Sequence, residues 1–162
     1  MSTTEITEAV QYLTFKLDEE TFALDVAKVR EILEESSITK VPQTPNFMRG
    51  VINLRGSVVP VIDLRLKFGM SQTEKTVNTC IIVVEIQLDN ETIVLGALAD
   101  SVQEVIEMEP AQIEAAPHIG SRMNSDFIKG MGKHDNRFIM ILDIDRVFSC
   151  DELVSVTGKN CD

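Results

Sequence analysis

The chain has 162 residues, of which 44% are apolar and 25% are charged, so it is long enough to form one compact unit with a buried core. Its formal charge of −11 excludes a nucleic-acid binder, because neutralising phosphates requires clustered Lys and Arg. No basic and apolar leader opens the chain, and no apolar run approaches the roughly 18 residues of a membrane span. We therefore expect a cytoplasmic protein whose partners are proteins or small molecules.

The first half begins with two predicted strands. Apolar and polar residues alternate in Leu13–Leu17 and again in Phe22–Val26, which predicts a hairpin with its turn at 18–21. Residues 26–33 follow, and the spacing of their apolar side chains predicts two helical turns. Two β-type runs between Phe47 and Phe68 then flank a turn made of Asn53, Leu54, Arg55 and Gly56. The glycine alone would allow a hairpin, so the arginine requires another reason.

The second half repeats the first. The pattern Leu-Asp-x-Glu-Thr-x-x-Leu occurs at 17–24 and again at 88–95, which is 71 positions later. Further matches follow in the same order, and the offset reaches 80 by the last of them: 29–32 with 102–105, 41 and 45 with 113 and 117, 47–50 with 127–130, and 61–64 with 141–144. Most of the added length predicts an inserted loop around 118–126, which is rich in Gly, Ser and Asn. A short helix from Ile144 to Phe148, continued around 151–154, is predicted to close the chain.

The repeat predicts a mainly β fold with little helix. Each half contains five short strands, and closing them into a small barrel would remove exposed sheet edges. Units of about 70 to 80 residues are marginal alone, so we expect the two halves to pack as one cooperative body. The predicted domain covers 11–150, with subdomains at about 11–70 and 79–148 whose termini can cross over, and a short tail covers 151–162.

Comparing the two halves separates residues that the fold needs from residues that it does not need. Gly50 and Gly130 occupy matching positions, as do Asp63 and Asp143, so all four are interpreted as architectural. Leu54, Arg55 and Gly56, however, correspond to His134, Asp135 and Asn136, so folding does not demand an arginine in this turn. The planar donors of Arg55 suit a partner's carboxylate. The alternatives are a solvated turn residue or an intramolecular pair with Glu31 or Glu34, and Glu31 itself recurs as Glu104, which favours a structural role for it.

No residue pattern indicates catalysis, a cofactor or a metal. His134 and Asp135 are chain neighbours, and neither His134 nor His118 has a second ligand at metal-binding spacing. Cys80 lies in an apolar run and is predicted to be a core residue. Glycine-rich phosphate loops, nucleophile elbows and zinc motifs are all missing from the sequence, so we expect no enzymatic activity. The alternative from the enzyme class is a small hydrolase using His134 with Asp135 or Cys80.

One long motif resembles a known family. Phe47 to Arg65 reads Phe-x-Arg-Gly-Val-x-Asn-Leu-Arg-Gly-x-x-x-Pro-x-x-Asp-Leu-Arg, which closely resembles the CheW-type coupling proteins of bacterial chemotaxis, and the likeness extends from about Gln11 to Phe148. The resemblance implies two intermeshed five-stranded SH3-like barrels and no enzymatic activity. It also implies an adaptor that couples the cytoplasmic tips of chemoreceptors to the histidine kinase CheA and supports the assembly of their arrays.

The resemblance further implies a set of partner-binding residues. They are Val29, Glu31, Gly50, Arg55, Val102 and Val105 in a receptor-facing groove, with Asn53, Leu54 and Gly56 shaping the turn. Kinase contact would fall on outer strands and turns of the first barrel. The protein would then be cytoplasmic, recruited to membrane-bound receptor arrays, without direct membrane contact. An alternative is a CheW-like adaptor for a non-flagellar chemosensory kinase pathway.

Overall fold

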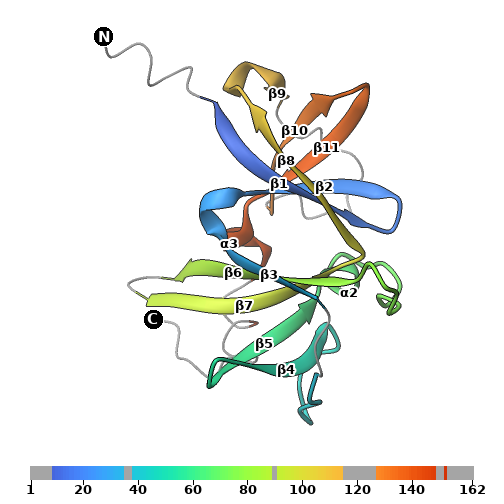
Figure 1. The fold of residues 1–162 in the computed structure, drawn as a ribbon, viewed down its shortest axis with the longest axis vertical. Coiled ribbons are helices and arrows are strands. Elements are labelled where there is room, and N and C mark those ends of the chain that lie inside the picture. Colours follow the sequence, from blue (N-terminus) through green and yellow to red (C-terminus); the bar gives the residue numbers. More distant parts are fainter. Residues whose placement is uncertain (1–8, 35–37, 89–90, 115–126, 149–151, 153–162) are drawn as a thin grey trace.

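The structure, a computed structural model, describes residues 9–34, 38–88, 91–114, 127–148 and 152. The predicted mainly β class is confirmed, with two mixed sheets stacked one above the other (Figure 1). The five-stranded sheet contains β3 (Val29–Glu34), β4 (Met48–Leu54), β5 (Ser57–Asp63), β6 (Cys80–Leu88) and β7 (Glu91–Ala99). The six-stranded sheet contains β1 (Val10–Leu17), β2 (Glu20–Asp25), β8 (Ser101–Met108), β9 (Ile113–Glu114), β10 (Ile128–His134) and β11 (Arg137–Leu142).

Short helices connect or follow these strands. They are the 3-10 turns η1 (Val26–Lys28) and η2 (Pro110–Gln112) and the α-helices α2 (Leu64–Lys67) and α3 (Ile144–Val147). The position of α3 confirms the helix predicted from Ile144, whereas its predicted continuation around 151–154 lies outside the described residues except for Glu152. The predicted inserted loop at 118–126 also lies outside them.

The two halves of the chain exchange their hairpins. The hairpin β1–β2 of the first half pairs with β8 and β11 of the second half, and the hairpin β6–β7 of the second half pairs with β3 and β5 of the first half. Both exchanges use the same geometry, because β2 runs parallel to β11 and β7 runs parallel to β5. Each sheet therefore contains strands from both halves. The division into subdomains at 11–70 and 79–148 stays a prediction.

The matching glycines lie where a second segment of the chain crosses close to the backbone. A Cβ on Gly50 would lie 2.2 Å from the carbonyl oxygen of Thr39, and a Cβ on Gly130 would lie 2.8 Å from that of Glu114. Both crossing residues pair with the strand that carries the glycine, Thr39 with Val51 and Glu114 with Met131. Only glycine fits such an approach, so the structure supports the architectural interpretation of both positions.

Apolar side chains form one core inside each sheet and a larger core between them. The shared core takes residues from both sheets, among them Phe15, Leu24, Ile82 and Leu95. Two aromatic contacts join the halves across it at matching repeat positions: Phe68 stacks on Phe127 at 4.7 Å between ring centroids, and Phe47 lies 5.9 Å from Phe148. This arrangement supports one cooperative unit, since neither sheet can keep its inner face dry without the other.

The prediction of two helical turns at 26–33 is wrong beyond Lys28. Only Val26–Lys28 is helical, in η1, and Val29–Glu34 forms strand β3. Along β3 half-buried and exposed residues alternate with the period of two that a strand requires. The apolar spacing of Val29 and Leu33 fits both periods, and pairing with β6 selects the strand. Cys80 opens β6 as a partly exposed free thiol and belongs to none of the buried clusters, so the prediction that it is a core residue is wrong.

Candidate functional site

The turn between β4 and β5 has a backbone that arginine rarely adopts. Arg55 has φ of 51° and Gly56 has φ of 88°, the two positive values of a type I′ turn, which favours Asn, Asp and Gly. The side chain of Asn53 supports the turn by accepting a hydrogen bond from the Gly56 N–H at 2.8 Å. In the matching turn Asp135 and Asn136 have φ of 52° and 63°. The second turn thus uses preferred residues where the first uses arginine.

Arg55 makes a two-pronged ion pair with Glu31 of β3. Its Nη1 and Nη2 donate to the two carboxylate oxygens at 2.6 and 2.9 Å. The hydrogen bond from Arg55 lowers the pKa of Glu31 below its ordinary value of 4.5, and the charges of Arg55 and Arg30 act in the same direction. Because 74% of the Arg55 side chain is exposed, water screens the pair and it adds little to folding stability. The pair fixes the orientation of the guanidinium and leaves its other donors open to solvent.

A groove opens beside this ion pair. It has a volume of about 530 Å³, and strands β3, β4, β5 and β7 of the five-stranded sheet supply its walls. Leu54, Val58 and Val94 line it together with Arg30, Glu31 and Arg55. Val58 is 72% exposed although it is apolar and belongs to a strand. An apolar floor beside two arginines and one carboxylate suits a partner surface with apolar residues and acidic groups.

The matching place in the six-stranded sheet has different chemistry. A smaller hollow of about 230 Å³ is lined there by Glu104, His134, Asp135 and Arg137, among others. Glu104 corresponds to Glu31, but an aspartate stands where Arg55 would be. The backbone of Glu104 is held by the buried Thr14 hydroxyl, which donates to the Glu104 carbonyl at 2.7 Å and accepts from the Glu104 N–H at 3.1 Å. The fold therefore builds this turn and hollow twice, and only the first copy has an arginine at the tip of the turn, because Arg137 of the second copy follows the turn on β11.

The predicted binding residues separate into groups. Glu31, Leu54 and Arg55 line the groove, while Asn53 and Gly56 shape its turn. Val29 and Val102 lie at the starts of β3 and β8 and pack partly against the shared core, whereas Val105 is 52% exposed on β8. Gly50 is buried beneath Thr39, so its position is explained by the close approach of the two strands. The sequence did not single out Arg30, Val58 or Val94 as groove residues.

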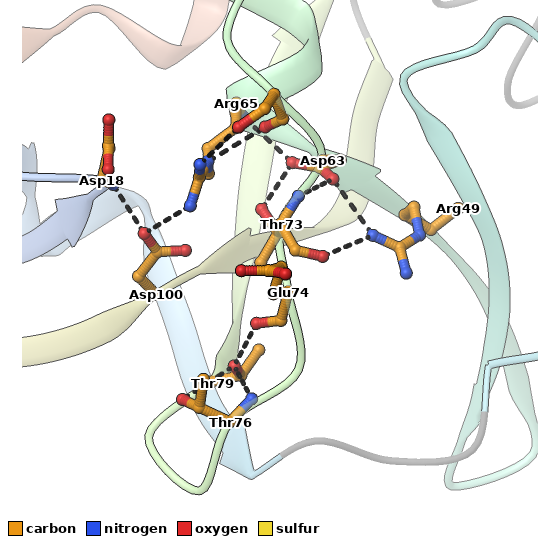
Figure 2. Close-up of polar contacts among 10 residues, drawn as sticks. Asp18, Arg49, Asp63, Arg65, Thr73, Glu74, Thr76, Thr79 and Asp100 are labelled. Carbon is orange, nitrogen blue, oxygen red and sulfur yellow. Dashed lines mark hydrogen bonds and ion pairs between the residues drawn. The ribbon is translucent and has the colours of Figure 1, made fainter.

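A buried polar cluster was also missed (Figure 2). The carboxylate of Asp63 is fully buried and accepts hydrogen bonds from Arg49 at 3.1 Å and from the N–H and hydroxyl of Thr73 at 2.9 and 2.7 Å. It also caps α2 by accepting from the Arg65 N–H. Repetition of the aspartate as Asp143 was the available signal, but its partner Thr73 lies in the connection between the halves and has no counterpart in the sequence pattern.

Groups typical of other sites are sparse in the described part of the chain. No three of its His, Cys, Asp and Glu side chains are placed to hold a metal ion. His134 Nε2 lies 3.5 Å from Oδ2 of Asp135, which is largely exposed, so this contact does not orient the imidazole as the buried aspartate of a hydrolytic site does. None of the described helices is long and apolar enough to cross a bilayer.

Known proteins share both the sequence and the fold. A family model for the CheW-like domain matches residues 11–152. The chain is 34% identical to chemotaxis protein CheW of Klebsiella aerogenes, over 90% of this chain and 86% of that protein, and 33% identical to chemotaxis protein CheW of Bacillus subtilis, over 90% of each. The crystal structure of the scaffolding protein TtCheW from Thermoanaerobacter tengcongensis superimposes with a TM-score of 0.79 and 35% identity, covering 94% of this chain and 92% of that one. The chain therefore belongs to the CheW-like domain family.

Proposed function

We propose that this protein is a non-catalytic chemotaxis adaptor that couples the cytoplasmic tips of chemoreceptors to the regulatory domain of the histidine kinase CheA and supports array assembly. Family membership supports the adaptor role, and the name of its structural relative is that of a scaffolding protein. The working place is then the cytoplasm, with recruitment to membrane-bound receptors through the partner. Its surface makes no direct membrane contact in this proposal.

The observation that carries the receptor role is the Arg55 turn. Its backbone favours other residues, its ion pair is exposed, and the second copy of the turn dispenses with it. The arginine therefore has a use other than folding. On a protein of net charge −11, a groove with two arginines is a local exception that suits an acidic and apolar face of a helical hairpin. Glu31 would hold Arg55 in the orientation in which it meets the partner.

Co-sedimentation with receptor-containing membranes, with and without the kinase, tests this role. Arg55→Asn is the sharp variant, because asparagine is preferred in the turn and the unfolding temperature should stay constant or rise. We expect its affinity for receptor membranes to fall by about tenfold, as for the loss of one charged hydrogen bond. Asp135→Asn makes the same kind of change in the matching turn and should bind normally.

Three results would contradict the assignment. Receptor binding by Arg55→Asn at the wild-type level would remove Arg55 from the receptor surface. Loss of kinase binding with receptor binding intact would move the contact to the other partner. A large fall in unfolding temperature would instead return Arg55 to a structural role.

A further inference from the structure

The chain crosses from one sheet to the other at two places that match in the repeat. The first crossing runs from β2 through η1 to β3, and the second runs from β7 through Asp100 to β8. A charged residue stands at each crossing, Lys28 at the end of η1 and Asp100 directly after β7. Both residues pair with the short helix that follows the last strand of one half.

At the second crossing the partner helix is α2. The Asp100 N–H donates to the carbonyl of Lys16 in β1 at 2.9 Å. Its Oδ2 accepts from Arg65 Nη1 at 2.9 Å and also from the Asp18 N–H (Figure 2). Asp100 Oδ1 is buried and has no hydrogen bond within the described part of the chain. The ion pair with Arg65 is therefore what offsets the negative charge of the Asp100 carboxylate. We call Arg65 with Asp100 the α2 latch. It ties the helix of the five-stranded sheet to the β1–β2 turn of the six-stranded sheet.

At the first crossing the partner helix is α3, which lies between the sheets (Figure 1). Lys28 Nζ is 2.7 Å from Asp145 Oδ2, and Asp145 Oδ1 accepts from the N–H of Gln87 in β6 at 2.9 Å. We call Lys28 with Asp145 the α3 latch. It ties the helix of the six-stranded sheet to β6 of the five-stranded sheet.

The two latches have the same position and opposite polarity. Arg65 and Asp145 are 80 positions apart, the offset of the surrounding repeat, so a cation on α2 corresponds to an anion on α3. What recurs is an ion pair at the crossing, with its sign free to change. Charges placed on the surface without a shared role would not form an ion pair at both crossings with the two signs exchanged. We therefore infer that the latches are positioning pairs that set the angle between the two sheets.

The latches differ in strength. Side chains of the α2 latch are 12% and 23% exposed, and those of the α3 latch are 29% and 30% exposed. Arg65 also donates from Nε and Nη2 to Ser71 at 3.0 and 2.7 Å. The α2 latch is therefore the stronger of the two, and when the angle between the sheets changes we expect the α3 latch to break first.

The predicted receptor surface adjoins both latches. Val29 directly follows Lys28, and Val102 lies two residues after Asp100. Val29 belongs to β3, which also lines the Arg55 groove, whereas Val102 belongs to β8 of the other sheet. Opening either latch therefore moves Val102 relative to Val29 and the groove, so the latches also position the receptor surface. This last step rests on the proposed function, whereas the control of the angle between the sheets does not.

The angle can be measured by double electron–electron resonance on the full chain. Spin labels at Val58→Cys in β5 and Phe138→Cys in β11 report one exposed site on each sheet, after the three native cysteines are replaced by serine. Lys28→Met and Arg65→Met each break one latch. Arg30→Met is the matched control for the distance measurement alone, because its pair with Glu85 at 3.2 Å joins two strands of the same sheet. Receptor co-sedimentation compares the latch variants with the wild-type chain, without spin labels, because Arg30 and Val58 line the groove.

We expect both latch variants to broaden the distance distribution, Arg65→Met more than Lys28→Met, and their combination to broaden it most. Amide exchange gives a second readout: Gln87 should lose about two- to fivefold of its protection in Lys28→Met, and Asp18 at least about tenfold in Arg65→Met. If Arg65→Met fails to fold, Arg65→Lys replaces it. An unchanged distribution in the combined variant, or equal broadening by Arg30→Met, overturns the latches. Broadening without any change in receptor co-sedimentation overturns only their role at the receptor surface.

Discussion

Replacing Asp63 with asparagine tests whether the buried cluster of Figure 2 holds the connection between the two halves. Oδ1 of Asp63 accepts from Thr73 Oγ1 and the Arg65 N–H, and Oδ2 accepts from the Thr73 N–H and Arg49. Asparagine keeps one oxygen and sets an NH₂ group against two donors. The Thr73 N–H then loses its acceptor, and the Arg49 guanidinium keeps only the Thr73 carbonyl, to which Nη1 donates at 3.2 Å.

The expected loss of unfolding free energy is about 3 kcal/mol, since each donor left unsatisfied costs about 1–3 kcal/mol. Arg49 contributes at the lower end because 28% of its side chain is exposed and water screens it. For a chain of this size the loss corresponds to a fall in Tm of about 10 °C. Urea unfolding followed by far-ultraviolet circular dichroism would measure it, with a second probe to establish a two-state transition.

The repeat provides the control. Asp143 caps α3 in the same way, but its carboxylate is 34% exposed and its other partner, Arg146 Nε, is 3.6 Å away. Asp143→Asn should therefore cost about 1 kcal/mol or less. Equal losses in the two variants would show that Asp63 acts only as a helix cap and would refute the role of the cluster.

Two further outcomes follow from the turn and the strand crossing. The pKa of Glu31, read by NMR titration, should lie below 4.5 and rise in Arg55→Asn. Because the pair lowers the pKa of Glu31 in the folded state, its small stabilisation is present at higher pH and is lost as the pH falls through the folded-state pKa. An unchanged titration in Arg55→Asn would show that the pair does not persist in solution. Gly50→Ala should lower the unfolding free energy by about 3 kcal/mol or prevent folding. The added Cβ of Gly56→Ala meets no atom within 4 Å, so this variant should cost only about 1–2 kcal/mol through its positive φ. Similar costs for the two variants would argue against the close approach of Thr39.

Sequence reasoning reached what is local or repeated. The hairpins follow from alternation, the architectural glycines from their recurrence, and the Arg55 turn from comparison with its second copy. Distant pairing was expected only in general form, as subdomains whose termini can cross over: no local pattern encodes that the exchange of hairpins joins β2 with β11. Strand β3 was misread because its apolar spacing satisfies two periods, and only β6 decides between them. The Asp63 cluster was missed because Thr73 and Arg49 come from separate segments.

The exchange of hairpins leads to a final prediction about cooperativity. Each half of the chain supplies two strands to the sheet of the other half, and the shared core between the sheets uses both. A fragment ending at Val77 would keep Asp63 with Thr73 but lose β6 and β7, and the complementary fragment would lose β1 and β2. Val77 is 99% exposed, so a break there disturbs little besides the local turn at 76–79.

We therefore expect fragments 1–77 and 78–162 to be unfolded separately and to regain β structure when mixed at equal concentration. Circular dichroism of each fragment and of the mixture would show this, and the unfolding midpoint of the mixture should rise with concentration, because assembly is then bimolecular. A fragment that unfolds cooperatively by itself would mean that one sheet can close its core without the exchanged hairpin. That result would remove the physical reason for treating the two sheets as one unit.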